Sequence, residues 1–391
     1  MGLEMLRNIM INIAYLVHSL RAGGIERSIT RIVNRLDRSE FCPSIICLDK
    51  SGPAEQWLES EVPVIEIGKK SGNDLMAVRR LSCCLRDRNI GILQSHNWGT
   101  LLEGIFARKL SGTPFHIHAE RGTVMGMVEA KGTRYWLRAR AMSMALTQVH
   151  KVISNAHAVA ERVQERCGYS AQKIEIIPNG VPEVCLEDRQ DIRRQVRLKL
   201  GLDSESILIG SVGRLEVVKG FNFAMKAFAT VHSSHPNMHL VLVGDGLERE
   251  SLTDLAQTLG VSLNVHFVGR QSNVDHWLAA LDIYLNSSLS EGMSQSIIEA
   301  MSAGLPIIAT DVGDSAKILG DNEETVGMCV RTADPNALAI GLKRLVVEPE
   351  LREMFAKRSK QKHSLCYSEE ILVRKYQNLY RSVVGGAVIR P

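Results

Sequence analysis

Short apolar runs alternate with longer stretches of helical spacing along the whole chain. The runs that predict strands are MINIAYLVH, PSIICLD, VPVIEIG, GILQSH, FHIHAE, KVISNA and IEIIPNG in the first half, and SILIGSVG, HLVLVGDG, NVHFVGR, DIYLNSS, PIIATDVG and GMCVRT in the second. Near-continuous Val, Ile and Leu favour strands that are buried on both faces of a parallel sheet. Their alternation with helical stretches is typical of doubly wound α/β architecture. The pattern therefore predicts an α/β chain with two Rossmann-like halves.

A cluster of proline and glycine at 178–182 (PNGVP) marks the boundary between these halves. A charged helical stretch follows it, and a length of 391 residues favours two domains. The last helical stretch, 368–384, carries apolar residues at helical spacing. Ligands of such sheets bind beyond the carboxyl ends of the strands, so we expect the site at those ends, in a cleft between the domains.

The segment 290–313, SEGMSQSIIEAMSAGLPIIATDVG, carries the most specific candidate site. Glu291 stands in a polar turn, and Glu299 follows among apolar helical residues, where a carboxylate is costly unless it is hydrogen-bonded. The turn through Gly292, Met293 and Ser294 directs backbone N–H groups at an anion where the helix begins. Two carboxylates that accept hydroxyl groups, beside a helix end that accepts phosphate, suit a sugar nucleotide. The alternative is a Glu299 on a boundary face, with its carboxylate in water.

Two cations, Arg214 and Lys219, follow the predicted strand SILIGSV within the segment GRLEVVKG, 213–220. Such a pair at the carboxyl end of a strand fits a diphosphate, because Arg forks onto two oxygens and Lys acts as a point charge. The spacing does not match a P-loop, so neither a kinase nor an ATPase is inferred. The alternative is a pair of solvated loop cations.

Glycine turns end other strands of the second half. Gly244 and Gly269, the latter followed by Arg270, would line the same edge as Gly213 and Arg214. Each of them is equally consistent with a simple turn. Neither half carries GxGxxG after its first strand, which argues against a nicotinamide dehydrogenase.

The first half offers two further candidates. Gly23 and Gly24 follow the first predicted strand and open a helix, where the backbone can approach a phosphate closely; the alternative is a tight turn. His118, in HIHAERG, ends another strand and is expected to face the cleft, although a histidine at a strand end is often structural. A His beside a Glu suggests metal, but no third ligand stands at a useful spacing, so no metal is expected.

Composition narrows the class of protein. The chain is 45% hydrophobic and 23% charged, as in soluble enzymes, and no apolar run approaches the roughly 18 residues that span a bilayer. We interpret the apolar N-terminal stretch as a buried strand, since asparagines interrupt it and no convincing cleavage site follows.

The eight cysteines form no CxxC pair, which favours a reducing, cytoplasmic compartment. Residues 1–180 carry 24 Lys and Arg against 17 Asp and Glu, a balance that suits either an anionic partner or a solvated surface.

Seven segments together resemble glycosyltransferase family 4, and most closely its bacterial exopolysaccharide and cell-envelope enzymes. They run in order through nearly the whole chain: GGIE (23–26), HNWGT (96–100), IIPNGV (176–181), GRLEVVKG (213–220), VGDG (243–246), FVGR (267–270) and EGMSQSIIEAMSAGLPIIATDVG (291–313). The resemblance implies a GT-B fold, two Rossmann-like domains facing across a cleft. It also implies that the last helix returns to the first domain, so that 1–182 plus 367–391 form the acceptor side and 183–366 the donor domain.

The same resemblance implies an activity: transfer of a hexose-type sugar, with retention at the anomeric carbon and without a metal or other cofactor. The donor would be a nucleoside-diphosphate sugar such as a UDP-sugar. The implied catalytic residues are Arg214, Lys219, Glu291 and His118. The implied donor-binding residues are Gly23, Gly24, Gly213, Gly244, Gly269, Arg270, Gly292, Met293, Ser294 and Glu299. Many relatives carry Gly and Glu where this chain has Asp314 and Lys317, which puts the donor contacts there in doubt.

The expected acceptor is a glycan or a polyprenyl-diphosphate-linked sugar. The basic, aromatic segment 131–148, with Arg134, Tyr135, Trp136, Arg138 and Arg140, suits either contact with an anionic inner leaflet or a packed surface helix. We therefore expect a cytoplasmic protein, peripheral on the inner face of the membrane. Two alternatives stay open: a non-catalytic nucleotide-sugar-binding protein, and a GT-B sugar-nucleotide epimerase. No nucleic-acid module is present.

Overall fold

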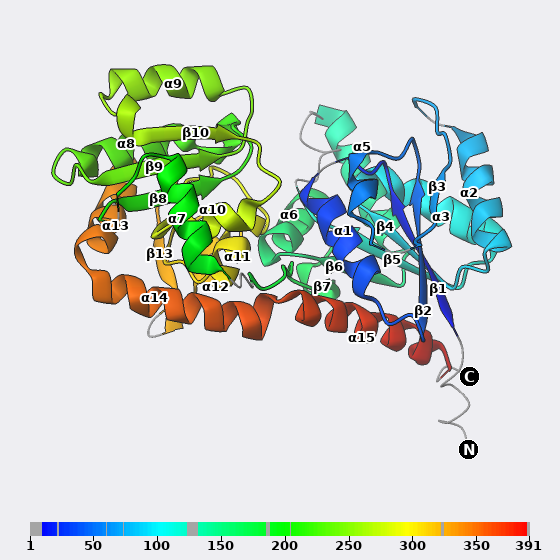
Figure 1. Cartoon of the computed structure of the whole chain (residues 1–391). Coiled ribbons are helices and arrows are strands. Elements are labelled where there is room, and N and C mark those ends of the chain that lie inside the picture. Colours follow the sequence, from blue (N-terminus) through cyan, green and yellow to red (C-terminus); the bar gives the residue numbers. More distant parts are fainter. Residues whose placement is uncertain are drawn as a thin grey trace. The chain divides into compact units, whose positions relative to one another are not determined.

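The computed structural model describes two compact units, each built on its own parallel sheet (Figure 1). It describes residues 10–388 apart from 22, 60, 73, 123–131, 185–187, 204 and 322–323. Unit 1 comprises the described residues up to Asn179 together with those from Glu369 onward, and unit 2 comprises Gly180–Ser368. Unit 2 is thus inserted between two separate parts of unit 1.

Unit 1 is a seven-stranded sheet with the order β3-β2-β1-β4-β5-β6-β7. Its strands are β1 (Ile11–Val17), β2 (Phe41–Cys47), β3 (Val64–Glu66), β4 (Ile92–His96), β5 (Phe115–Glu120), β6 (Lys151–Ser154) and β7 (Ile174–Ile176). Its helices are α1 (Gly24–Arg35), α2 (Leu75–Asp87), α3 (Trp98–Ser111), α5 (Gly132–Leu146), α6 (His157–Cys167) and α15 (Glu369–Val388), with 3-10 turns at Pro53–Trp57 and Ala171–Lys173.

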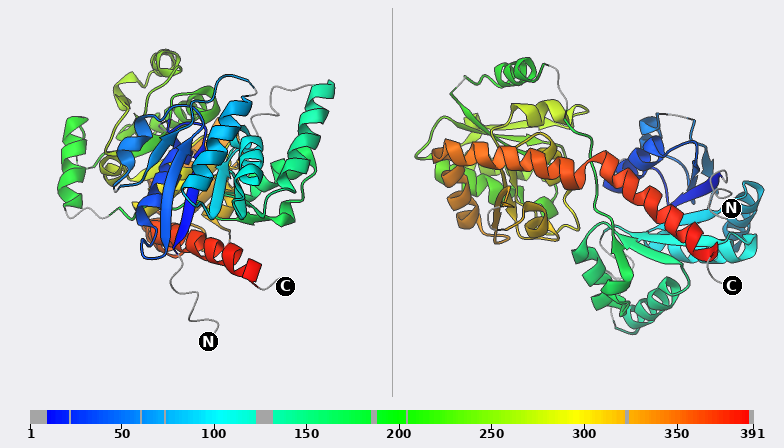
Figure 2. Two further views of the ribbon diagram at one scale, coloured as in Figure 1. Left: turned by 90° about the vertical axis from the view of Figure 1, so that its right-hand side faces the viewer. Right: turned by 90° about the horizontal axis from the view of Figure 1, so that it is seen from below.

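Alternate residues of the buried strands pack on opposite faces of this sheet. Ile13 and Ile45 face α1 and α15, where Tyr376 and Tyr380 join the same core; Figure 2 shows α15 lying along unit 1. Ala14, Leu16 and Ile46 belong to a second core with α2 and α3. Helices therefore cover both faces, as the continuous apolar runs predict.

Unit 2 is a six-stranded sheet with the order β10-β9-β8-β11-β12-β13. Its strands are β8 (Ile207–Val212), β9 (Met238–Val243), β10 (Val265–Gly269), β11 (Ile283–Asn286), β12 (Ile307–Thr310) and β13 (Gly327–Val330). Its helices are α7 (Arg189–Lys199), α8 (Phe221–His232), α9 (Arg249–Thr258), α10 (Val274–Ala280), α11 (Gln295–Ser302), α12 (Ser315–Leu319), α13 (Pro335–Val347) and α14 (Pro349–Lys362), with 3-10 turns at Val217–Lys219 and Ser262–Asn264 and a π-helical turn at His363–Tyr367.

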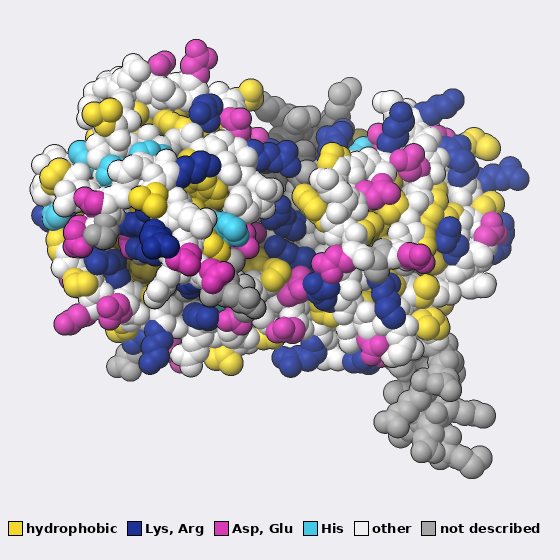
Figure 3. All heavy atoms as spheres, in the orientation of Figure 1, with side chains coloured by type: hydrophobic (Ala, Val, Ile, Leu, Met, Phe, Trp, Pro, Cys, Tyr) yellow, Lys and Arg dark blue, Asp and Glu magenta, His cyan; other side chains and the backbone are white. Residues whose placement is uncertain are grey.

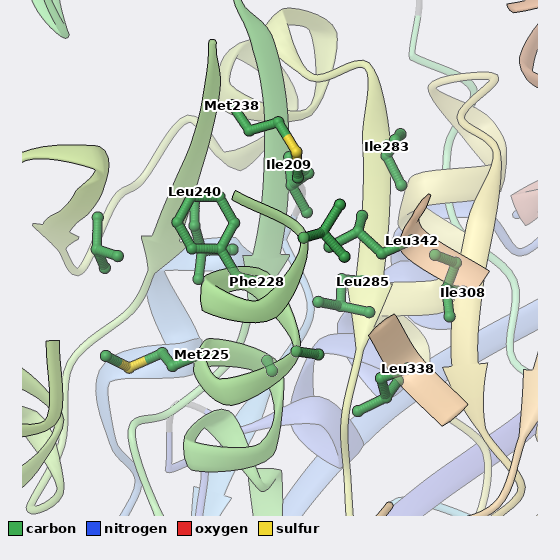
Figure 4. Packing of buried hydrophobic residues seen from close by; sticks show 14 of the residues in the cluster. Ile209, Met225, Phe228, Met238, Leu240, Ile283, Leu285, Ile308, Leu338 and Leu342 are labelled. Carbon is green, nitrogen blue, oxygen red and sulfur yellow. The ribbon is translucent and has the colours of Figure 1, made fainter. Parts of the chain in front are cut away.

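A hydrophobic core of unit 2 lies between its sheet and helices α8 and α13. Phe228 of α8 and Leu342 of α13 pack with Leu240, Ile209 and Ile283 of three neighbouring strands (Figure 4). All five side chains are fully buried. At about 25 cal/mol per Å² of apolar surface removed from water, such a core is the main stabilising contribution to this unit. The two doubly wound units confirm the predicted α/β fold class.

Local signals explain where several helices begin and end. Asp334 precedes α13, and its carboxylate accepts a hydrogen bond from the Ala337 amide at 3.0 Å. Pro335 occupies the first position, where no intrahelical amide bond is lost. Helices α3 and α6 end at Gly112 and Gly168, both in the left-handed conformation that glycine adopts without strain.

The segments by which the chain enters and leaves unit 2 are hydrogen-bonded to each other. The Val181 amide donates to the Tyr367 carbonyl at 3.0 Å, and Val181 pairs with Ser368 in a parallel bridge. Nε2 of the fully buried His363, in the π-helical turn, lies 3.0 Å from the Val181 carbonyl. The first and last segments of unit 2 therefore lie side by side.

A buried hydroxyl pair joins α15 to the sheet of unit 1. The Tyr15 and Tyr380 hydroxyls lie 2.6 Å apart, and Tyr380 donates to Gln94 Oε1 at 2.8 Å. Burial raises the pKa of both tyrosines, so both stay protonated at neutral pH. Tyr376 of the same helix accepts a hydrogen bond from the buried Arg121. The C-terminal helix thus supplies polar partners as well as apolar area.

We expect Tyr380→Phe to lower the free energy of unfolding by about 1–3 kcal/mol, because the buried Tyr15 hydroxyl and Gln94 each lose a partner. Urea denaturation measures the change. Tyr135→Phe is the control, because its hydroxyl only reaches the Arg166 carbonyl at 3.4 Å; its expected cost is below about 0.5 kcal/mol. Equal costs for the two variants would contradict the buried network.

Two histidine rings meet at the edge of the unit 2 sheet. His239 Nδ1 of β9 and His266 Nε2 of β10 lie 3.2 Å apart. Burial, and then the neighbouring His266, lower the pKa of His239 to about 4, and burial lowers the pKa of His266. The pair is therefore neutral in the folded protein at neutral pH.

This pair predicts that unit 2 loses stability as the pH falls from about 6.5 towards 4. In that pH window the histidines of the unfolded chain, with pKa values near 6.5, bind protons, whereas the folded pair stays neutral. Protonation therefore favours the unfolded state. We expect His239→Gln/His266→Gln to show a smaller loss of stability between pH 7 and pH 4 in urea titrations. His18→Gln, at an exposed position, should follow the wild type. A double variant with the same pH dependence as the wild type would refute the assignment.

Charges of both signs are distributed over the surface. On the face of the molecule drawn in Figure 3, Lys and Arg side chains lie interspersed with Asp and Glu. Among the helices that the structure describes, none combines the length and the apolar character needed to cross a membrane.

Candidate active site

The strand order of unit 2 places a topological switch point between β8 and β11. From β8 the chain proceeds outward to β9 and β10, and from β11 it proceeds the other way to β12 and β13. Ligands of open α/β sheets bind at such a point, beyond the carboxyl ends of the strands. Lys219 follows β8 and Glu291 follows β11, so the loops of the switch point carry the two most strongly predicted residues of opposite charge.

Lys219 and Glu291 form a close ion pair there. Lys219 Nζ lies 2.5 Å from Glu291 Oε1, and the side chains are 21% and 15% exposed. Ser288, 1% exposed, donates its hydroxyl to the same Oε1 at 2.9 Å. Partial burial reduces screening by water and salt, so this pair interacts more strongly than a surface pair. The site thus offers a cation and an anion within one hydrogen bond of each other.

Backbone contacts between the two loops hold the pair in place. Ser287 donates its hydroxyl to the Lys219 carbonyl at 3.0 Å, and the Leu289 amide donates to the Val218 carbonyl at 2.8 Å. Gly220 has φ +61°, and a Cβ there would lie 2.2 Å from the Ser287 carbonyl oxygen. Only glycine fits this position without moving the Glu291 loop.

The glycines predicted after β8, β9 and β10 adjoin one another. The Gly213 amide donates to the Val243 carbonyl at 3.0 Å, and the Gly244 amide donates to the Gly269 carbonyl at 2.9 Å. A Cβ on Gly244, whose φ is +146°, would lie 1.9 Å from the Gly213 carbonyl oxygen. Gly269 has φ +72° with open space around its Cβ position. Because Gly244 has no side chain, the Gly213 backbone can approach it closely. At Gly269, open space remains where a Cβ would stand.

Arg214 lies at the same edge, but its side chain points elsewhere. It is 75% exposed, and its Nη1 lies 2.5 Å from Glu216 Oε1. Arg270 is also exposed. Arg214 would have to leave Glu216 to meet a ligand at Lys219.

The turn after Glu291 leads into α11 without a side-chain cap. Ser294 is the N-cap residue, but its hydroxyl accepts from Asn286 Nδ2 at 3.2 Å instead of capping the helix. Gly292 is held from the start of α12, because the amide of the N-cap residue Asp314 donates to its carbonyl at 3.0 Å. Met293 and Ser294 are buried. The first amides of α11 therefore lack the side-chain oxygen that an N-cap usually supplies.

Glu299 lies one turn further along α11. It is half-buried, and its Oε1 accepts a hydrogen bond from Gln295 Nε2 at 3.3 Å. The neighbouring Ile298 and Ala300 are fully buried. Its carboxylate thus lies at the edge of the apolar helix face, a position that fits both the predicted hydroxyl acceptor and the alternative of a boundary-face carboxylate.

The unit 1 candidates lie at the carboxyl ends of β1 and β5. Gly23 is the N-cap of α1, with extended backbone at φ −140°, and Gly24 is exposed as its first residue. A Cβ on Gly23 would lie 2.6 Å from Glu26 Oε2, and burial raises the pKa of Glu26. Gly23 therefore leaves space beside a carboxylate at the start of the helix.

His118 differs from its expected orientation. We predicted that it faces a cleft, but its side chain is fully buried between Ser95, whose Oγ lies 2.9 Å from Nδ1, and Glu120, whose Oε2 lies 3.4 Å from Nε2. The alternation of β5 turns His116, His118 and Glu120 to one face, under α3. Direct contact with a ligand would require this strand end to open, so a contact role for His118 is not supported by the structure.

Sequence reasoning missed three residues that build the site. Ser287 and Ser288 position the two charged side chains, and Gly220 permits the loops to meet. A run of hydroxyls directly after an apolar strand, NSSLS, was the available signal. In the part of the chain that the structure describes, no group of three or more His, Cys, Asp or Glu side chains is arranged to hold a metal ion.

Two family models match this chain, one in each half. The family model described as Glycosyltransferase Family 4 matches residues 22–183, and the model described as Glycosyl transferases group 1 matches residues 192–362. The chain belongs to glycosyltransferase family 4. This confirms the resemblance drawn from the seven sequence segments, and the group 1 match contains every predicted site residue of unit 2.

Two bacterial glycosyltransferases are among the relatives of this chain. The lipopolysaccharide core biosynthesis glycosyltransferase LpsE of Rhizobium meliloti is 30% identical over 233 residues, which cover 59% of this chain and 64% of LpsE. The chain thus spans less than two thirds of that relative. A Campylobacter jejuni N-acetylgalactosaminyltransferase, named for a diphospho-undecaprenol-linked acceptor, is 23% identical over 366 residues, which cover 90% of this chain and 94% of that protein.

Solved structures show the same fold. The crystal structure of Anabaena Alr3699/HepE in complex with UDP superposes with a TM-score of 0.80 at 18% identity, and the match covers 96% of this chain and 100% of HepE. Together with the two doubly wound sheets, this likeness confirms the predicted GT-B fold.

Proposed function

We propose that this family 4 protein transfers a hexose-type sugar from a nucleoside-diphosphate sugar to a glycan or lipid-linked acceptor in cell-envelope polysaccharide synthesis. The observation that carries the proposal is the Lys219–Glu291 pair at the switch point of unit 2. A cation there meets the diphosphate, and a carboxylate beside it meets sugar hydroxyls. The uncapped start of α11 adds backbone donors for the phosphate.

In this proposal Lys219 stabilises the negative charge that grows on the leaving diphosphate, without a metal. Arg214 joins it after leaving Glu216, and Glu299 accepts hydrogen bonds from the ribose. Transfer proceeds with retention by a front-face route, in which the leaving diphosphate takes the acceptor's proton. The residues of this chain contribute positioning and charge stabilisation rather than a covalent nucleophile.

The relatives support the choice of substrate class. LpsE is named for lipopolysaccharide core biosynthesis, the Campylobacter enzyme is named for a diphospho-undecaprenol-linked acceptor, and HepE was solved with UDP. We accordingly propose a UDP-sugar donor and a polyprenyl-diphosphate-linked acceptor for this chain.

A donor screen tests the proposal. The purified protein is mixed with a panel of UDP-, GDP- and ADP-sugars in EDTA, and both thermal stabilisation and slow donor hydrolysis are measured. We expect one donor to raise the melting temperature and to be hydrolysed. Stabilisation without hydrolysis or transfer to any acceptor would favour a non-catalytic binding protein, and conversion to an isomeric sugar would favour an epimerase.

We also propose peripheral contact of unit 1 with the inner face of the membrane. Trp136 and Leu137 of α5 are 61% and 60% exposed, and the Arg140 guanidinium lies 6.0 Å from the Trp136 ring centre. Exposed aromatic and apolar side chains beside arginine suit an anionic lipid surface. The side chain of Arg134, which belongs to the same predicted segment, lies outside the described residues.

Vesicle sedimentation tests this contact. We expect the protein to pellet with vesicles that contain phosphatidylglycerol and to stay in solution with phosphatidylcholine alone. Trp136→Ser/Arg140→Gln should lose the anionic-lipid dependence, whereas Arg194→Gln, on exposed α7 of unit 2, should keep it. Equal pelleting of all three proteins would refute the contact.

A further inference from the structure

The Lys219–Glu291 ion pair has a consequence for which ligands the site retains. A diphosphate and the Glu291 carboxylate are both anions that can bind the Lys219 ammonium. In the structure, Glu291 Oε1 lies 2.5 Å from that ammonium. With the side chains only 21% and 15% exposed, water does little to weaken their attraction. A diphosphate that binds the Lys219 ammonium therefore competes with Glu291 for it.

We propose that Glu291 is an internal competitor of the diphosphate for Lys219, so that the site favours the intact nucleotide sugar over the sugar-free nucleoside diphosphate. This inference rests on the proposed function and adds a selectivity to the same site. In this proposal the nucleotide sugar stays bound more tightly than the nucleoside diphosphate, and Ser288 is a positioning residue for Glu291.

The selectivity follows from what Glu291 contacts once it has left Lys219. An intact donor brings sugar hydroxyls that donate hydrogen bonds to the displaced carboxylate. A nucleoside diphosphate lacks the transferred sugar, so the displaced carboxylate gains no hydroxyl donor from that sugar to offset the loss of Lys219 and faces the negative phosphates. Glu291 therefore returns to Lys219 when the sugar has been transferred, which promotes release of the product.

Hydrogen bonds to its neighbours fix Ser288 in a position from which it can hold Glu291 while the phosphate replaces that carboxylate at Lys219. Its hydroxyl donates to Glu291 Oε1 at 2.9 Å, and its carbonyl accepts from Thr310 Oγ1 at 2.6 Å and from Thr332 Oγ1 at 3.4 Å. Its amide donates to Asn286 Oδ1 at 3.2 Å. A residue held from two neighbouring strand ends presents a fixed hydroxyl, which stays with Glu291 when Lys219 turns to the phosphate.

Calorimetric titration with UDP, GDP, ADP and inorganic pyrophosphate tests the competition. We expect Glu291→Gln, which keeps the shape and removes the charge, to bind pyrophosphate and the cognate nucleoside diphosphate on the order of tenfold more tightly than the wild type. The same variant should bind the nucleotide sugar no more tightly than the wild type. Glu353→Gln, exposed on α14, controls for net charge and should leave every affinity unchanged.

A double-mutant cycle separates competition from simple repulsion. If Glu291 competes for Lys219, the gain from Glu291→Gln disappears in a Lys219→Ala background; if Glu291 only repels anions, the gain persists. Ser288→Ala should weaken binding of both the diphosphate and the donor, the opposite sign to Glu291→Gln, because the displaced Glu291 then lacks the Ser288 hydroxyl.

The outcomes distinguish the inference from the proposed function. Pyrophosphate that binds equally to wild type and Glu291→Gln, or a gain that survives in the Lys219→Ala background, would overturn the competition while leaving a nucleotide-sugar enzyme. No binding of any nucleoside diphosphate, pyrophosphate or nucleotide sugar to either protein would overturn both.

Discussion

Replacing Lys219 with alanine is expected to lower kcat for sugar transfer by about a hundred- to thousandfold. The ammonium lies at the switch point, where the diphosphate would sit, and the negative charge on that group increases as the bond to the sugar breaks. An interaction that strengthens in the transition state affects kcat more than KM. Steady-state kinetics with the donor found in the screen, with folding checked by circular dichroism, measure both parameters.

Lys226→Ala is the matched control for this prediction. Lys226 is an exposed lysine on α8, the helix that begins just after Lys219, and its ammonium lies over the Phe223 ring. We expect its kcat to stay within about twofold of the wild type. A Lys219→Ala enzyme that retains a third or more of wild-type kcat would remove Lys219 from the mechanism. Lys219→Arg should recover part of the activity, because the charge remains but its geometry changes.

Gly220→Ala is expected to destabilise unit 2 by about 3–5 kcal/mol and to abolish donor binding. Two costs add at this position: the left-handed φ of +61°, which a side chain disfavours, and a Cβ that would lie 2.2 Å from the Ser287 carbonyl oxygen. Relief of the collision requires the Lys219 and Glu291 loops to move apart. Urea denaturation and calorimetric titration with the donor measure the two effects.

Gly260→Ala carries only the first of these costs, the left-handed φ, and therefore serves as the control. Gly260 has nearly the same φ, +68°, but nothing lies within 4 Å of the position where a Cβ would stand. We expect it to lose only about 1 kcal/mol and to bind the donor like the wild type. If the two alanine variants are equally stable, the close approach of the Gly220 and Ser287 loops is not rigid.

The fold was predictable because its signals are local. Apolar runs such as SILIGSV and HLVLV are buried on both faces of the sheet, and only helices on both sides achieve that burial. These local signals do not determine the order of the strands, because nothing local in the sequence places β1 between β2 and β4. No strand order was therefore predicted from the sequence.

The candidate site was predictable at its charged residues and less so at their orientations. Lys219 and Glu291 stand at strand ends, where parallel strands bring loops together. Arg214 shares that position, yet Glu216, two residues on, holds it towards solvent. His118 stands at a strand end too, but the alternation of β5 turns it inward. Side-chain direction at a strand end depends on one residue of register, which apolar patterning leaves undetermined.

The insertion of unit 2 within unit 1 sets the order in which the two units are completed during synthesis. Helix α15, which buries Tyr376 and Tyr380 in the core of unit 1, is synthesised only after the whole of unit 2. At about 5–20 residues per second, translation of Gly180–Ser368 takes roughly 10–40 s. Unit 2 therefore emerges whole and begins to fold while the first-made sheet of unit 1 still lacks its covering helix. A nascent chain of this protein thus exposes the α15 side of that sheet for that interval, and chaperones have the longest access to it there.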